Sequence, residues 1–278
     1  MQRKKYALLD TDFLSKVYAS RLDRQNTLLD RLIELPCYEF YCHEKIREEI
    51  GCCIDRDSES ADIWLSDQIE AGKIICYTDE MILRELTGLY HKGGFTEYLL
   101  FLKRSCDIWE SGYFEQAFGK INVPENAADI SKFIQELTQC EAAVGRKKSL
   151  GEKKTFVLYQ MLELFHPGEV FVFCSDDIAA RNGIAGIGSM NCMSIIAAFY
   201  TLKQYSVERD IAYPYFAAYE RFLSGRNQSA LRVWSWIGSR TLSRGQVDCR
   251  QIFEEIYEDK FEVRKNGELQ YKQELSKK

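Results

Sequence analysis

Carboxylate side chains recur in four short segments of this chain, and three of the segments fall where a strand should pass into a helix. Asp10 and Asp12 lie in the first segment, Glu48 and Glu49 in the second, Glu152 in the third, and Asp176 and Asp177 in the fourth. Carboxylates that a fold brings together repel one another, and a divalent cation removes that repulsion. The first hypothesis is therefore a magnesium- or manganese-dependent site.

The acids that follow strands have a structural and a functional interpretation. Asp10 ends an apolar strand, and ligands of open α/β sheets bind beyond the carboxyl ends of strands. Asp12 lies where an acid caps the next helix, so we favour a cap for Asp12 and a site for Asp10. Ser175 is the expected N-cap after a later strand, and the helix dipole explains one of Asp176 and Asp177 but not both.

Glu49 and Glu152 lie on expected helices. Glu49 is near the C-terminal end of its helix, where the dipole disfavours a negative charge, and its spacing from Ile46 turns it toward the apolar face. Such a carboxylate calls for a cation, and a salt bridge and a metal ion explain it equally well. Glu152 completes a capping box with Ser149, which explains a glutamate at that position without any site.

Basic residues surround Glu152. Arg146, Lys147 and Lys148 precede it, and Lys153 and Lys154 follow it. Lysines are unfavourable at a helix N-terminus, and the phosphates of a nucleic acid passing nearby would explain them. A solvated charged loop is the more common explanation for such a run.

The elements that must position these residues alternate between strands and helices. Strands are expected at 6–10, 38–42, 73–77, 169–174 and 187–189, and helices at 11–20, 25–35, 43–50, 58–71, 151–165, 177–182 and 193–204. The segment from 79 to about 145 is almost wholly helical, with breaks at Gly93-Gly94 and Pro124. This rhythm predicts a mainly parallel sheet covered on both faces. Helices at 213–223, 230–237 and 251–257 follow, and then a hairpin that turns at Asn266-Gly267.

The composition is that of an ordinary globular protein. The chain has 278 residues and a net charge of -5, which argues against a general nucleic-acid coat protein but not against a nucleic-acid enzyme. No signal peptide or membrane-spanning run is visible. The ten cysteines include no C-x-x-C pair, so we expect reduced core cysteines in a cytoplasmic protein. For His43, His91 and His166 a surface or capping role is favoured over a metal role.

Taken together and in this order, the four acidic segments resemble the PIN-domain nuclease family. The resemblance is carried by residues 8–12 (Leu-Leu-Asp-Thr-Asp), Glu49-Ile50, residues 150–152 (Leu-Gly-Glu) and residues 175–181 (Ser-Asp-Asp-Ile-Ala-Ala-Arg). It covers residues 6–55 and 149–205. It implies an α/β/α three-layer sandwich at 1–205 with a long helical insert at about 56–145. Residues 206–278 would form a C-terminal helical extension that ends in a hairpin.

The resemblance also implies a ribonuclease with a Mg²⁺ or Mn²⁺ site, either the toxin of a toxin–antitoxin pair or an RNA-processing enzyme. The implied catalytic residues are Asp10, Glu49, Glu152 and Asp177, and the implied metal ligands are Asp10, Glu152, Asp176 and Asp177. Arg146, Lys147, Lys148, Lys153 and Arg181 would contact the RNA. A bound metal activates water for attack on the phosphodiester, so no histidine base is required. An antitoxin or another protein would dock on the insert or the extension; a homodimer is a further option, and no membrane is involved.

Two other interpretations stay open. Asp10-x-Asp12 after an apolar strand also fits a haloacid-dehalogenase-type phosphatase, in which Asp10 would be the nucleophile and Asp12 the general acid. The fold could also serve as a catalytically silent module that binds nucleic acid or protein. The aromatic residues after position 205 would then stack on bases, although aromatic residues at helical spacing usually pack in a core.

Overall fold

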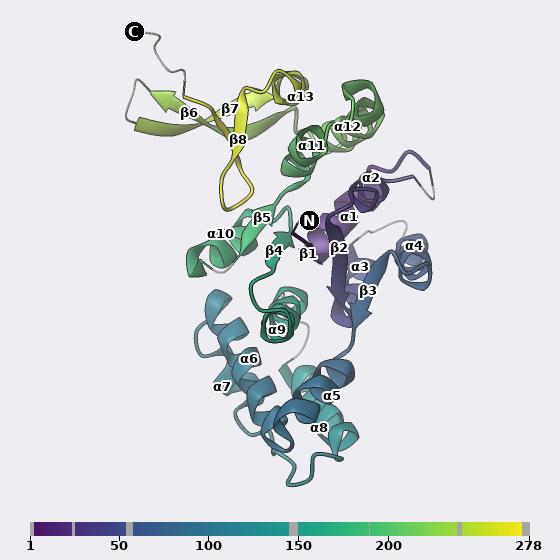
Figure 1. Cartoon of the computed structure of the whole chain (residues 1–278), viewed down its shortest axis with the longest axis vertical. Coiled ribbons are helices and arrows are strands. Elements are labelled where there is room, and N and C mark those ends of the chain that lie inside the picture. Colours follow the sequence, from purple (N-terminus) through teal and green to yellow (C-terminus); the bar gives the residue numbers. More distant parts are fainter. Residues whose placement is uncertain are drawn as a thin grey trace. The chain divides into compact units, whose positions relative to one another are not determined.

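The computed structural model describes residues 3–23, 26–53, 58–144, 150–188, 190–237 and 241–273. The fold is α/β, with a five-stranded parallel sheet of order β3-β2-β1-β4-β5 and helices against it, as a three-layer α/β/α sandwich requires (Figure 1). The strands are β1 (Lys5–Leu9), β2 (Tyr38–His43), β3 (Ile74–Tyr77), β4 (Val170–Cys174) and β5 (Asn191–Met193). The predicted fold class is confirmed.

Burial explains why these segments are strands. Ala7, Leu8 and Leu9 of β1 are fully buried, and Phe171 to Cys174 of β4 are buried as well. A strand covered on both faces reads as a continuous apolar run, which is how both segments read in the sequence. In the parallel register, Cys42 of β2 is paired with Cys76 of β3, and Phe173 of β4 is paired with Cys192 of β5.

The chain divides into two compact units. Unit 1 contains residues 1–11 and 39–171, and unit 2 contains residues 12–38 and 172–278. Helix α1 (Thr11–Ala19) begins in unit 1 at Thr11 and continues in unit 2. The C-terminal extension therefore shares its unit with most of α1, with α2 (Leu28–Ile33) and with β5, and no unit boundary lies near the expected position 205.

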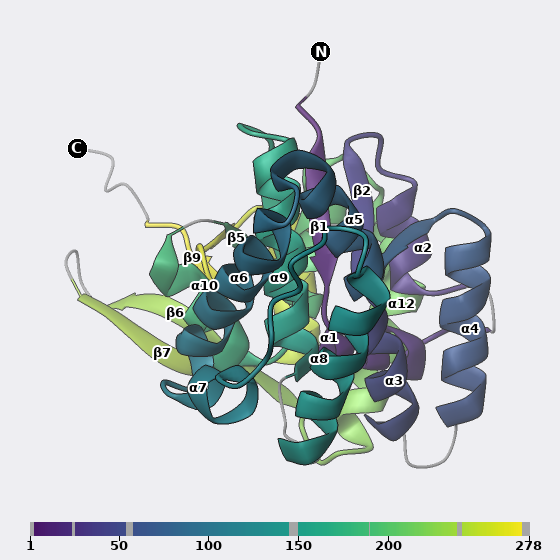
Figure 2. The same cartoon turned by 90° about the horizontal axis from the view of Figure 1, so that it is seen from below.

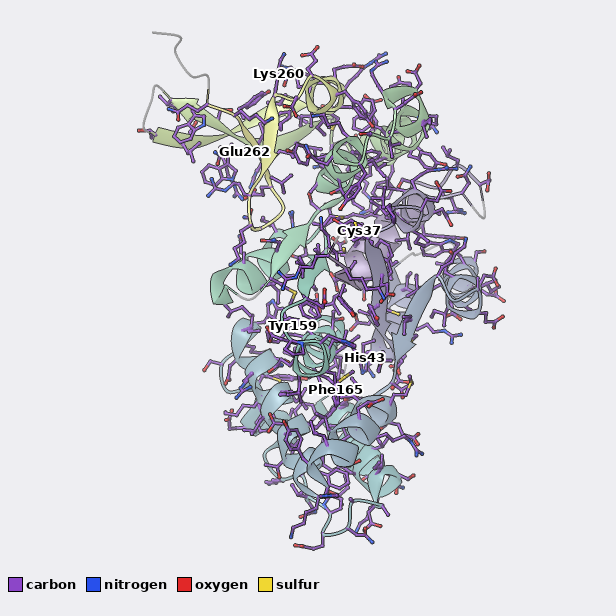
Figure 3. All side chains as sticks on the ribbon, in the orientation of Figure 1. Cys37, His43, Tyr159, Phe165, Lys260 and Glu262 are labelled. Atoms are coloured by element: carbon purple, nitrogen blue, oxygen red, sulfur yellow. The ribbon has the colours of Figure 1, made fainter. Side chains whose placement is uncertain are left out.

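Unit 1 holds β1, most of β2, β3 and a helical core. Its helices are α3 (Glu44–Cys53), α4 (Ser58–Glu70), α5 (Asp79–Tyr90), α6 (Gly93–Trp109), α7 (Tyr113–Phe118), α8 (Ile130–Val144) and α9 (Leu150–Phe165). Helices α5, α6, α8 and α9 pack together (Figure 2). Tyr159 projects from α9 (Figure 3). Its ring lies edge-on to that of Phe171, with 5.1 Å between the ring centroids. The predicted insert includes β3 and so contributes a strand to the sheet.

Unit 2 adds a second sheet to its helices. The helices are α10 (Ile178–Ile187), α11 (Ile195–Gln204), α12 (Arg209–Ser224) and α13 (Cys249–Tyr257). The sheet has the order β7-β6-β9-β8, formed by β6 (Ala230–Ile237), β7 (Thr241–Asp248), β8 (Phe261–Val263) and β9 (Leu269–Tyr271), and α13 lies beside it (Figure 1).

The hairpin predicted at Asn266-Gly267 is confirmed, because β8 and β9 pair antiparallel around it. Gly267 has φ +73°, and a Cβ there would lie 2.9 Å from the carbonyl oxygen of Cys192, so only glycine fits without strain. The Ser194 hydroxyl donates to the Gly267 carbonyl (2.7 Å), and the Cys192 N–H donates to the Lys265 carbonyl (2.7 Å). The turn thereby fastens the extension to β5.

Several predicted elements are wrong. Residues 230–237 form strand β6 instead of a helix, so the extension is not wholly helical. Of the strand expected at 187–189, Ile187 ends helix α10 and Gly188 is its C-cap, while position 189 lies outside the described residues. Helix α10 continues through Gly183 to Ile187, since the fully buried Ile184 gains more from packing than a helical glycine costs, about 1 kcal/mol. Helix α3 likewise continues through Gly51, which was expected to end it.

In the described part of the chain no helix is long and apolar enough to cross a membrane. Eight cysteine side chains are described and all are free thiols, six of them buried, in line with the expected core cysteines.

Candidate functional site

Glu49 joins three of the predicted segments within unit 1. Its Oε2 accepts a hydrogen bond from the Thr11 hydroxyl (2.8 Å), and its Oε1 accepts one from the Gly151 N–H (2.8 Å). Thr11 follows Asp10 directly, and Gly151 precedes Glu152. The Glu49 side chain on α3 therefore links the end of β1 to the first turn of α9. Thr11 lies 38 residues before Glu49 in the chain, and Gly151 lies 102 residues after it.

The contacts of Glu49 among the described residues come from neutral donors, so the salt bridge that the sequence allowed is not found there, and the metal ion stays a prediction. A hydroxyl and a backbone N–H share the carboxylate, and the N–H belongs to the first turn of α9, where the helix dipole favours a negative charge. Glu49 thus supplies part of the capping that the sequence assigned to Ser149, which lies outside the described residues. Each carboxylate oxygen retains a further lone pair for another ligand.

Asp10 and Glu152 flank these contacts. Asp10 is fully buried directly after β1, and Glu152 is half-buried in the first turn of α9. Asp10, Glu49 and Glu152 thus belong to segments that hydrogen bonds hold together inside unit 1. This is the part of the predicted cluster that the structure brings together within a single unit.

Gly151 permits this arrangement because a side chain would occupy the place of the Glu49 carboxylate. A Cβ at position 151 would lie 2.2 Å from Glu49 Oε2 and 2.9 Å from Ile46 Cδ1. The glycine of the Leu-Gly-Glu segment therefore has a steric role: it lets α3 approach the N-terminus of α9.

Gly151→Ala should lower the free energy of unfolding by about 1–3 kcal/mol, because the Glu49 carboxylate must leave its hydrogen bonds to make room. The matched control is Gly88→Ala in α5, where a Cβ meets no atom within 4 Å. This substitution should raise the free energy of unfolding by about 1 kcal/mol, because alanine has a higher helix propensity than glycine. Urea denaturation of both variants measures the difference. Equal stability of Gly151→Ala and wild type would mean that Glu49 does not depend on this contact.

In unit 2, Asp12 and Asp176 share one lysine. Lys16 Nζ lies 2.8 Å from Asp12 Oδ2 and 2.9 Å from Asp176 Oδ2. Burial raises the pKa of Asp12; the Lys16 charge lowers it, and the charges of Asp176 and Asp177 raise it further. Asp12 thus forms an ion pair one turn along α1, which is compatible with the structural role that the sequence favoured for it.

Asp176 and Asp177 have different surroundings. Asp176 also accepts hydrogen bonds from the Ile195 N–H (3.2 Å) and the Tyr219 hydroxyl (3.4 Å). Asp177 is the N-cap of α10, and its Oδ1 accepts from the N–H groups of Ala179 (2.6 Å) and Ala180 (3.3 Å). The N-cap is therefore Asp177 and not Ser175, which was the expected one.

Two of the predicted RNA-contacting residues are buried. Lys153 is 1% exposed, with Nζ 4.4 Å from the ring centroid of Tyr113. Arg181 is 6% exposed and donates to the carbonyls of Asn266 (3.2 Å) and Asp177 (3.5 Å). An incoming RNA could not reach the Lys153 ammonium without a rearrangement, so we leave Lys153 out of the proposed contacts. Arg146, Lys147 and Lys148 lie outside the described residues.

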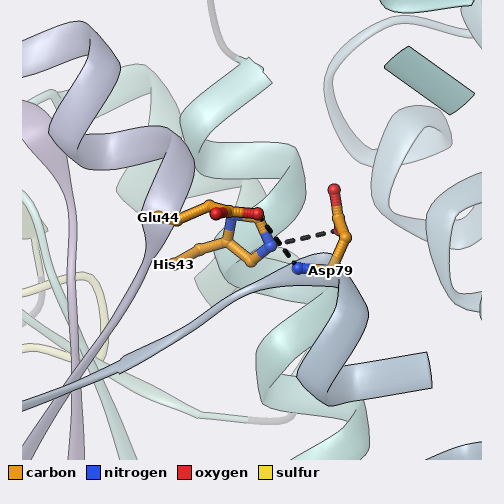
Figure 4. Close-up of side chains that lie close together, drawn as sticks. All are labelled: His43, Glu44 and Asp79. Atoms are coloured by element: carbon orange, nitrogen blue, oxygen red, sulfur yellow. Dashed lines mark hydrogen bonds and ion pairs between the residues drawn. The ribbon is translucent and has the colours of Figure 1, made fainter. Parts of the chain in front are cut away.

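Among the described residues, the group of metal-ligand atoms that lie within 4.8 Å of one another is a different one: His43, Glu44 and Asp79 (Figure 4). His43 Nδ1 accepts from the Lys45 N–H (3.1 Å), so His43 caps α3, and Nε2 faces Asp79 Oδ1 at 3.1 Å. The Asp79 N–H donates to Glu44 Oε1 (3.2 Å). The capping role expected for His43 is thereby found, but at a fully buried position rather than at the surface.

Lys154 already supplies the cation for this group. Its fully buried ammonium lies 2.7 Å from Asp79 Oδ2, 2.7 Å from Glu141 Oε1 and 2.8 Å from the Tyr98 hydroxyl. Burial opposes the charge of Asp79, but the ion pair with Lys154 and the contact with His43 outweigh it and lower the pKa of Asp79. The ammonium donates hydrogen bonds to Asp79 and Tyr98 and forms an ion pair with Glu141, so the carboxylates of this group already face a positive charge.

The sequence contained one signal for this network. Lysines in the first turn of a helix are unfavourable, and Lys153-Lys154 had been attributed to nearby phosphates. For Lys154 the compensating charges come instead from α5 and α8 of the same unit.

Comparison with protein-family models, with curated proteins and with solved structures finds no match for this chain.

Proposed function

We propose that this chain is a Mg²⁺- or Mn²⁺-dependent ribonuclease of PIN type. The observation that carries the proposal is the position of the Glu49 carboxylate between Thr11 and Gly151. These contacts hold together the three segments of unit 1 that resemble the family's acidic motifs. A resemblance in sequence order alone would not require the segments to meet in space.

The donor set suits the proposed metal ion. Asp10, Glu49 and Glu152 offer carboxylate oxygens, which are the hard ligands that Mg²⁺ and Mn²⁺ prefer. Asp10 and Glu152 would hold the ion, and when bound it would supply positive charge to stabilise the negative charge that develops on the phosphodiester. Glu49 orients this group, because its hydrogen bonds fix the positions of Thr11 and Gly151.

The acids of unit 2 enter the proposal only through the sequence. Asp176 pairs with Lys16, and Asp177 caps α10, so each has a structural partner already. Their assignment as metal ligands, and that of Asp177 as a catalytic residue, stay predictions. A cytoplasmic location, an antitoxin or other protein partner, and a homodimer also stay proposals; the free cysteines are compatible with a reducing compartment.

The test is incubation of the full chain with 5′-labelled single-stranded RNA in Mg²⁺, in Mn²⁺ and in EDTA. We expect cleavage with either metal, 5′-phosphate ends on the downstream fragments, and no cleavage in EDTA, because no side chain of the proposed site replaces the charge of the ion. Cleavage in EDTA, or products with 2′,3′-cyclic phosphates, would exclude this mechanism. Metal binding without cleavage, measured by calorimetry, would favour a silent module.

A haloacid-dehalogenase-type phosphatase is the second candidate. Two observations favour it: the pKa of Asp12 is raised, as a general acid requires, and Lys16 joins Asp12 to Asp176. The same preparation tested with p-nitrophenyl phosphate separates the two activities. Phosphomonoester hydrolysis without RNA cleavage would replace the ribonuclease by the phosphatase.

A further inference from the structure

A pocket of about 480 Å³ lies entirely within unit 2. Its walls include residues of α1, α10, α11, α12 and α13, of strands β6 and β7, and of the β8–β9 turn. Lys16 and Asp176 line one part of it, and Arg232, Arg244 and Gln246 of the β6–β7 hairpin line another. The pocket therefore connects the C-terminal extension with the Asp-Asp segment that follows β4.

The lining carries an excess of positive charge. Five cationic side chains line the pocket, Lys16, Arg181, Arg226, Arg232 and Arg244, together with two carboxylates, Asp176 and Glu268. Arg244 forms an ion pair with Glu268, and Lys16 forms one with Asp176. Three arginines are left whose charge no lining carboxylate neutralises, and such a surplus attracts a polyanion.

The contacts of these three arginines are neutral. Arg226 lies over the ring of Phe222, with its Cζ 4.5 Å from the centroid, and Arg181 donates to two backbone carbonyls. Arg232 is exposed on β6. In the described part of unit 2, no carboxylate lies within ion-pair distance of any of the three. The N–H donors of the exposed Arg226 and Arg232 can therefore turn to a ligand without the loss of an existing ion pair, whereas Arg181 is buried and bonded to its two carbonyls.

The hairpin arranges its polar residues in rows. Arg232 is directly opposite Gln246, and Trp234 is directly opposite Arg244, so all four side chains project from the same face. Arg232 and Arg244 are diagonal neighbours, for which the separation is about 7–8 Å. Arg232 therefore projects from the face of the hairpin that also carries Arg244 and Gln246, where its guanidinium can contact a phosphate of an extended strand.

We propose that this pocket binds single-stranded RNA, with Arg226 and Arg232 on its phosphates, and leads the strand to Asp176. The inference rests on the proposed ribonuclease function and names the place where its substrate binds. A strand is favoured over a free nucleotide because the exposed, unneutralised arginines come from two separate segments, Arg226 from the residues after α12 and Arg232 from β6. A duplex is disfavoured because a volume of about 480 Å³ suits a ligand of drug or nucleotide size.

The test measures binding without cleavage. The anisotropy of a 5′-fluorescein-labelled single-stranded RNA is titrated with full-length protein in EDTA, over a series of salt concentrations. Arg226→Gln with Arg232→Gln should raise Kd about tenfold or more, and should reduce the slope of log K against log salt by about 0.7 for each arginine. The matched control is Arg250→Gln, an exposed arginine of α13 outside the pocket, which should bind as wild type does.

A second variant separates charge from folding. Arg226→Lys with Arg232→Lys retains both charges and should keep the salt slope of wild type. Unchanged Kd and slope in the glutamine variant, at a melting temperature equal to wild type, would overturn the proposal. So would displacement of the RNA by equimolar AMP, because it would identify a nucleotide pocket. Absence of metal-dependent cleavage together with the expected binding changes would refute the ribonuclease while the RNA site stands.

Discussion

Asp10→Asn should reduce metal-dependent RNA cleavage by about 10²–10³-fold, the range found when one group that stabilises transition-state charge is removed. Asp10 is fully buried at the end of β1, beside the Thr11 hydroxyl that bonds Glu49. Asparagine has nearly the same volume, so the packing of the site is conserved. It lacks the negative charge that holds a divalent cation, and both the affinity for Mg²⁺ and the rate should therefore fall.

The matched control is Glu48→Gln. Glu48 is the immediate neighbour of Glu49, but its side chain is 62% exposed and lies 2.6 Å from Lys45 in a surface ion pair. The substitution removes one carboxylate from the same helix without touching the proposed site, so the rate should equal that of wild type. Single-turnover cleavage at saturating Mn²⁺ and thermal melting measure the two effects. Similar rates for Asp10→Asn and Glu48→Gln would remove Asp10 from the catalytic residues.

Elements whose own residues carry a clear pattern could be predicted. Strands β1 and β4 read as continuous apolar runs, and the hairpin at Asn266-Gly267 has its turn residues and its alternating strands within a few positions. Strand β6 could not be recognised in this way. Its partner β7 has the sequence Thr-Leu-Ser-Arg-Gly-Gln-Val-Asp, which lacks an apolar alternation, and its other partner β9 lies more than thirty residues away. Tertiary pairing, not local propensity, decides such a segment.

The candidate site was predictable in residues but not in contacts. The Gly-Glu segment and Glu49 were both singled out, yet each had an explanation within its own helix. The structure connects them, because the Gly151 N–H that needs a cap is capped by Glu49, 102 residues earlier. A capping partner so distant in the sequence leaves no local spacing pattern. The salt bridge that the sequence allowed for Glu49 is not found among the described residues, where two remote neutral groups donate to its carboxylate, and the metal ion stays a prediction.

The ion pairs of the Lys154 network could not be predicted from the sequence for the same reason. Its members come from β2, α5, α6, α8 and α9, and no two of them are close enough in the chain to form a recognisable motif. Removal of one partner from such a network lowers the free energy of unfolding, because the remaining charges are then buried without an opposite charge. The network is therefore expected to control the stability of unit 1 and not its chemistry.

Lys154→Met should lower the free energy of unfolding by about 3–5 kcal/mol, the cost of breaking a buried ion pair from one side. Methionine retains the apolar stem but leaves Asp79 and Glu141 without the ammonium that both contact. The control, Lys103→Met, removes an exposed lysine that pairs with Glu115, and solvent screening should keep its melting temperature close to that of wild type.

A double-mutant cycle with Asp79→Asn identifies the partner: if the loss comes from an unpaired Asp79 charge, the double variant should be more stable than the sum of the single losses predicts. Urea denaturation provides all four values. The phosphate role first suggested for this lysine predicts the opposite pattern, a higher KM for RNA at unchanged stability. Because the ammonium is fully buried among Asp79, Tyr98 and Glu141, we expect the stability to change and the KM of the remaining folded enzyme to stay the same.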